Sequence, residues 1–274
     1  MDKQIYLTAR MIANESATVT GPAFDATVSK LRSLFGDISA ELGNNISTIK
    51  GLFETNTVLF DKRAISNSID GFNFMSVSDL EVTVPMGLNV PMETYLEKLQ
   101  LASTYANTVV IDVLKPSVVQ LAKYVAKPEL MMSVRPGDIV AIRPKLQETK
   151  EMLGECLNHK AQLSKVPFKK AYRRLGEYES ASVTLNDLNK RIRSVDLSEI
   201  TELTDRIVDL FDKLHANLTE GGKVAISGPT ADTLAKIAVA LAEEIEFFGV
   251  YYHKLQEATE SYKLAVKRIE TLPR

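Results

Sequence analysis

One cysteine and three histidines are the residues of this 274-residue chain best suited to metal chemistry. Cys156 and His159 stand three positions apart beside Glu155, a spacing that places two ligands on one face of a helix. A stable zinc site needs three or four ligands, and His215 and His253 fall in other predicted helices. A half-buried cysteine on an apolar stripe is the alternative, and we favour it. We therefore expect neither a metal nor another cofactor.

The sequence offers no recognisable catalytic constellation. Nucleophilic catalysis needs a nucleophile, a base and an orienting group held together, and the Gly-x-Ser-x-Gly pattern of a nucleophile elbow is absent. Gly221-Gly222-Lys223 resembles a phosphate-binding loop only faintly, since Val224 follows where Ser or Thr is required, and the glycines fit a helix terminator better. We expect no enzyme. A site assembled from dispersed residues stays open, because such a site leaves no local signature.

Basic residues gather between positions 165 and 193, interleaved at first with Phe168 and Tyr172. Cations bind phosphates and aromatic rings stack on bases, so this is our candidate anion-binding site and nucleic acid is a candidate partner. The same residues also fit the solvated face of a helix whose apolar side holds Val166 and Leu175. The candidate residues are Lys165, Lys169, Lys170, Arg173, Arg174, Lys190, Arg191 and Arg193.

Long helices must position these residues, and the clearest one is C-terminal. From Leu234 to Ile269, apolar or aromatic residues recur at alternating steps of four and three, which predicts one helix from about Pro229 to Leu272, about 65 Å long. Its flanks are small or apolar where a two-stranded coiled coil would carry Glu and Lys, so we expect a multi-helix bundle. The candidate helix-packing interface comprises Leu234, Leu241, Ile245, Phe247, Phe248, Tyr251, Tyr252, Leu255 and Tyr262. Its adjacent aromatics could line a ligand pocket, but we favour packing.

Apolar stripes predict further helices over about 28–60, 92–126, 145–163 and 196–220. Pro116 should kink or split the second of them. The last of these should run antiparallel to the C-terminal helix, because the link between them is short. Apolar and polar residues alternate at 80–84, which predicts a strand or hairpin.

The predicted fold is therefore mainly all-α: an elongated multi-helix bundle of long antiparallel helices, with a small β-strand or hairpin insertion near 71–91. The Pro-rich segment 127–144 reads as a connector between an N-terminal helical region, 1–126, and a C-terminal bundle region, 145–274, and the two could still pack as one domain.

Composition and the N-terminal sequence limit the partners and the cellular location that we expect. A net charge of −2 provides no general attraction to nucleic acid or to an anionic membrane, and no apolar run reaches the length of a membrane-spanning helix. The N-terminus lacks the basic start and apolar run of a signal peptide. We expect a cytoplasmic or intracellular protein, or one incorporated in a viral particle, with no membrane partner.

Three hypotheses for function follow. The favoured one is a non-enzymatic structural or assembly protein that acts through helix–helix contacts with copies of itself or with other subunits, as virion and scaffold components do. The alternative is a nucleic-acid-associated helical protein that uses the basic cluster 165–193. The third is an enzyme with a dispersed site.

Overall fold

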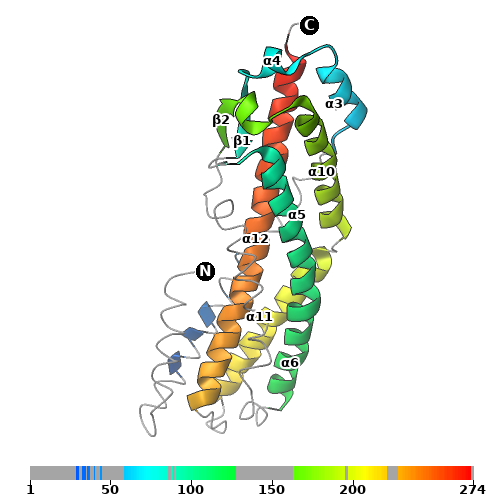
Figure 1. Cartoon of the computed structure of the whole chain (residues 1–274). Helices are drawn as coiled ribbons and strands as arrows, with labels where there is room; N and C mark the ends of the chain where they lie inside the picture. Colours follow the sequence, from blue (N-terminus) through cyan, green and yellow to red (C-terminus); the bar gives the residue numbers. More distant parts are fainter. Residues whose placement is uncertain are drawn as a thin grey trace. The chain divides into compact units, whose positions relative to one another are not determined.

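The computed structural model describes residues 59–85, 88, 90–127, 163–194, 197–220 and 228–272, together with positions 29, 30, 33, 34, 36, 37, 40 and 44 (Figure 1). Helices account for 81% of these residues and the remainder includes one two-stranded sheet, which confirms the predicted mainly α class. Contacts divide the chain into two compact units, each drawn from three segments. The first unit comprises 1–48, 107–146 and 197–249, and the second comprises 49–106, 147–196 and 250–274. Within the described residues, no helix is long and apolar enough to cross a bilayer.

The predicted helix over 92–126 is confirmed, and its interruption has a physical cause. Helix α5 (Met92–Val109) continues through the π-helical turn η1 (Val110–Leu114) into α6 (Lys115–Ala126). Pro116 has no N–H to donate and its ring would crowd the carbonyl of Asp112, four residues earlier. The wider π turn lies immediately before the proline and accommodates the missing bond without ending the helix.

Two long helices follow in the first unit and match their predicted ranges. Helix α11 (Leu197–Glu220) buries its whole apolar stripe, which consists of Ile200, Leu203, Ile207, Leu210 and Leu214. Helix α12 (Gly228–Glu270) begins in the first unit and ends in the second. The first part of α12 runs opposite to α11 in Figure 1, as the short link predicts. Helix α6 packs on α11 in the same unit.

The second unit contains the sheet. Strand β1 (Glu81–Pro85) pairs antiparallel with β2 (Leu163–Pro167), with Glu81 opposite Pro167. The predicted strand is confirmed, but the hairpin alternative is wrong, because the partner strand lies far downstream. The helical interpretation of the basic segment is also wrong at its start, since Lys165 and Val166 lie in β2. The predicted helix over 145–163 falls outside the described residues except for Leu163, which lies in β2.

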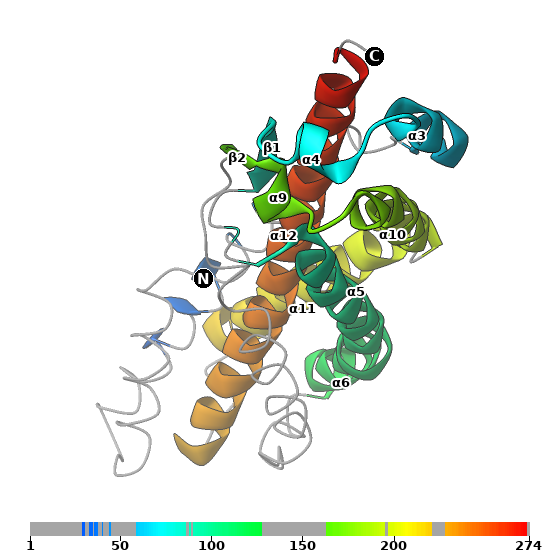
Figure 2. The ribbon, with the colours of Figure 1, turned by 45° about the horizontal axis from the view of Figure 1, so that its top comes forward.

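Four further helices belong to the described part of the second unit. Helix α3 (Lys62–Ile69) begins at the N-cap Asp61, and α4 (Phe74–Val77) begins at the N-cap Asn73. Between them, Gly71 adopts a φ of 85° in a turn closed by the Phe72 N–H to Ile69 carbonyl bond, a conformation that favours glycine. Helix α9 (Phe168–Ala171) contacts both strands, and α10 (Leu175–Ser194) packs beside α3, an arrangement visible in Figure 2.

An aromatic cluster forms the core of the second unit. The rings of Phe168, Tyr172, Tyr178 and Tyr262 are tilted or edge-to-face against one another at centroid distances of 4.9 to 5.6 Å. The Tyr262 hydroxyl donates a hydrogen bond of 2.8 Å to the Tyr178 carbonyl, which ties α12 to α10. The cluster therefore joins α9, α10 and the C-terminal part of α12.

The predicted domain boundaries remain predictions. Each unit takes segments from both sides of the connector 127–144, which lies outside the described residues apart from Lys127. Of the N-terminal helix predicted over 28–60, the described positions between 29 and 44 are helical and Leu34 is fully buried. Residues 45–58 lie outside the described part of the chain.

Candidate functional site

The residues suited to metal chemistry do not meet where the structure describes them. Cys156 and His159 lie outside the described residues, as does the side chain of His215. The Nε2 atom of His253 lies 3.5 Å from Oε1 of Glu257, one turn along α12. No three metal-ligating side chains come together within the described part of the chain.

A buried ion pair stands beside this histidine. The Lys254 Nζ donates to Oε2 of Glu257 at 2.9 Å, and the two residues are only 2% and 7% exposed. The attraction between the two ions offsets part of the free energy that each loses by being buried away from water. The pair brings an ammonium, a carboxylate and an imidazole together on one face of α12. Because the ammonium and the carboxylate are buried and paired with each other on one helix, we interpret the group as structural.

The structure separates the predicted anion-binding residues into two groups. Five lie together and exposed: Lys165 on β2, Lys169 and Lys170 on α9, and Arg173 and Arg174 before α10. Lys190 and Arg191 lie near the other end of α10, about 22 Å along that helix from its start, and the Arg193 side chain is outside the described residues.

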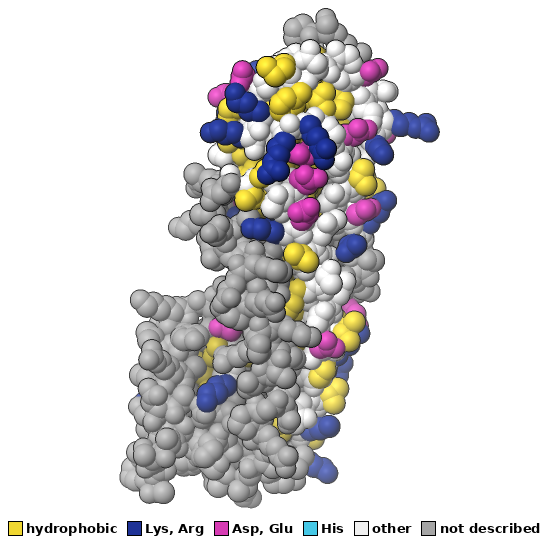
Figure 3. All heavy atoms as spheres, in the orientation of Figure 1, with side chains coloured by type: hydrophobic (Ala, Val, Ile, Leu, Met, Phe, Trp, Pro, Cys, Tyr) yellow, Lys and Arg dark blue, Asp and Glu magenta, His cyan; other side chains and the backbone are white. Residues whose placement is uncertain are grey.

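Acidic side chains interrupt the group of five. Lys169 pairs with Asp79 at 2.7 Å, and the Nε of Arg174 lies 3.6 Å from the buried carboxylate of Glu177. On the face drawn in Figure 3, Lys and Arg side chains are mixed with Asp and Glu. The local positive field is therefore weaker than the sequence cluster suggests.

The predicted helix-packing interface on α12 packs within the chain. Its described members are all buried: Leu241, Phe247, Tyr251, Tyr252, Leu255 and Tyr262. The side chains of Leu234, Ile245 and Phe248 lie outside the described residues. Burial raises the pKa of Tyr251 to about 12 and also raises the pKa values of Tyr172, Tyr178, Tyr252 and Tyr262. The described seam residues are core, so they are not free for a partner.

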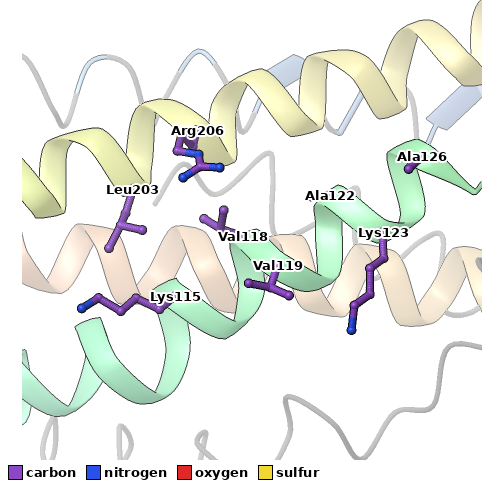
Figure 4. Close-up of a pocket in the computed structure, with 8 residues that line it drawn as sticks. All are labelled: Lys115, Val118, Val119, Ala122, Lys123, Ala126, Leu203 and Arg206. Carbon is purple, nitrogen blue, oxygen red and sulfur yellow. The ribbon is translucent and has the colours of Figure 1, made fainter.

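A groove in the first unit is the best candidate site, and the sequence did not reveal it. It lies between α6 and α11, has a volume of about 510 Å³, and is shown in Figure 4. Its apolar residues are Val118, Val119, Ala122, Ala126 and Leu203, and its cations are Lys115, Lys123 and Arg206. Val119 is 56% exposed, whereas its neighbour Val118 is 4% exposed. An apolar strip therefore lies open beside the core of this unit.

The charges around the groove are partly uncompensated. Lys115 pairs with Glu199 of α11 at 2.7 Å. Lys123 and Arg206 are exposed and form no ion pair with any residue that the structure describes. The two adjacent valines, 118 and 119, were a weak sequence signal, because neighbours on a helix point about 100° apart and a narrow buried face holds only one of them.

Comparison with known proteins gives no direct assignment. No protein-family model matches this chain, and no curated protein and no solved structure matches it. Its function is therefore inferred from the residues and their geometry.

Proposed function

We propose that this chain is a non-enzymatic assembly protein that binds a helix of another subunit in the groove between α6 and α11. The observation that carries the proposal is the open apolar strip around Val119. Fully burying a valine side chain contributes about 1.5 kcal/mol or more, and a partner that covers Val119, which is 56% exposed, gains part of that amount. The described residues of the α12 seam are buried, so they do not offer such a surface.

The shape of the groove suits a helix. A helix that lies against two neighbouring helices inserts its side chains between theirs, and an amphipathic partner does so with residues spaced by three and four. The lining residues of α6 run from Lys115 to Ala126, which corresponds to about 17 Å, or about three turns of a partner helix.

Photo-crosslinking in the source cells tests the proposal. Benzoylphenylalanine replaces Val119 in the groove or, as a matched control, Val183, an exposed valine of α10 in the second unit. We expect an adduct of discrete mass from position 119 and none from position 183. Equal or absent crosslinking at the two positions would overturn the proposal.

The nucleic-acid alternative rests on the five exposed cations around α9. It predicts oligonucleotide binding that weakens steeply with salt and disappears when Lys169, Lys170, Arg173 and Arg174 are replaced by alanine. An absence of binding at low salt would refute it. The acids beside Lys169 and Arg174 make it the weaker proposal.

A further inference from the structure

We infer that the occupant of the α6–α11 groove is an amphipathic helix that carries acidic residues beside its apolar stripe. The inference rests on the proposed function and names the chemistry of the partner. It follows from the combination of an apolar floor with cations on both helices that border it (Figure 4).

The cations fix the charge of the partner. Lys123 belongs to α6 and Arg206 to α11, so the two helices that border the groove each carry a cation without an ion pair among the described residues. A guanidinium matches a carboxylate through two parallel hydrogen bonds, and an ammonium provides a second point of attraction. A partner helix with glutamate or aspartate on both flanks of its apolar stripe can pair with Lys123 on one side of the groove and with Arg206 on the other.

The same charges argue against a second copy in the groove. A symmetric dimer places the same patch of each subunit against the other, so the cations of one groove would lie near the cations of the other. Like charges across an interface oppose association. The partner is therefore a different surface of acidic character.

The openness of the floor argues against a small amphiphile. Sites for small molecules cover most of the ligand surface, commonly about 70–90% of it. Val119, in the floor, remains 56% exposed, so the groove covers only one side of an occupant. A helix needs no more than that, since its other face can stay in water.

Synthetic peptides test the inference. Two fluorescent peptides of about 14 residues share one leucine stripe spaced by three and four, and carry either glutamate or lysine on both flanks. We expect the unaltered full chain to bind the glutamate peptide at least about tenfold more tightly than the lysine peptide, with the difference shrinking as salt rises. The double variant Lys123→Glu/Arg206→Glu should reverse this order.

Lys213→Glu is the matched control, since Lys213 lies exposed on α11 but does not line the groove. It should leave the peptide preference unchanged. Thermal unfolding followed by circular dichroism shows that each variant is folded.

Three results would overturn the inference. Equal binding of the two peptides, or no binding of either, would refute the acidic-helix assignment, while a crosslink from position 119 would still support the proposed function. A crosslink to a copy of this same chain would replace it by self-association. Binding to phosphatidylglycerol vesicles that Lys123→Glu/Arg206→Glu abolishes, without peptide binding, would replace it by an anionic membrane surface.

Discussion

The replacement Lys254→Met tests whether the buried ion pair on α12 holds its helix in place. Lys254 and Glu257 are almost fully buried, and their contact is 2.9 Å. Methionine keeps much of the volume of the lysine stem but removes the ammonium. The Glu257 carboxylate then loses the hydrogen bond from Lys254 and stays where water cannot solvate it.

The expected cost follows from that burial. Removing one partner of a buried pair destabilises a protein by about 3–5 kcal/mol, because the remaining charge is uncompensated. For a chain of this size, this corresponds to a fall in the urea midpoint of about 1 to 2 M. The double variant Lys254→Met/Glu257→Leu removes both charges and should recover most of the loss, since apolar pairs of similar volume replace buried ion pairs at little cost.

An exposed pair on the same helix provides the control. Lys263 and Glu260 also stand three positions apart, at 3.3 Å, but their side chains are 38% and 48% exposed. Lys263→Met should cost less than about 1 kcal/mol, because water solvates the glutamate that remains. Urea unfolding at fixed pH, followed by circular dichroism, measures both variants. If Lys254→Met is no more costly than Lys263→Met, or if the double variant is worse than the single one, the reasoning from burial is wrong.

Three further predictions concern the second unit. Burial raises the pKa of its core tyrosines above 10, so their contribution to the free energy of unfolding is complete below pH 10 and falls as the pH rises further. Absorbance at 295 nm should show these tyrosines ionising only as ellipticity is lost. Ionisation in the folded state would contradict this. Asn186→Ala removes both 2.8 Å bonds that clamp the Phe60 backbone, so hydrogen exchange at Phe60 should accelerate while exchange in α12 does not. Gly71→Ala should cost about 1 kcal/mol in urea unfolding from its positive φ alone, because nothing lies within 4 Å of the new methyl group; an unchanged midpoint would contradict this.

The long helices were predictable because their signal repeats many times. Helix α12 is 43 residues long and its apolar pattern runs from Leu234 to Ile269, and a pattern of that length has few alternatives. Pro116 predicted an interruption of the helix where the π turn lies, although the sequence does not distinguish a kink, a split or a widened turn. Each of these features depends on residues close together in the chain.

The sheet was only half predictable, and the reason is the distance along the chain between its strands. Strand β1 shows clear alternation, but its partner begins at Leu163, after a long intervening segment. Pairing between distant segments leaves no local pattern. Strand β2 is also only five residues long and carries lysine and serine, so its composition indicated a helix face instead.

The groove was not predictable for a different reason. The sequence does not show which apolar residues of a helix are buried within the chain and which stay exposed. Val118 and Val119 are adjacent and chemically identical, yet one is 4% exposed and the other 56%. Helix α6 turns Val118 into the core with α11, and Val119 then points to the side where no described element covers it. The wide apolar face of α12 predicted a helix-packing interface, and the described residues of that interface are buried within the chain. The second apolar stripe of α6 stays open instead, and in our proposal it binds another subunit whose acidic residues match the cations beside it.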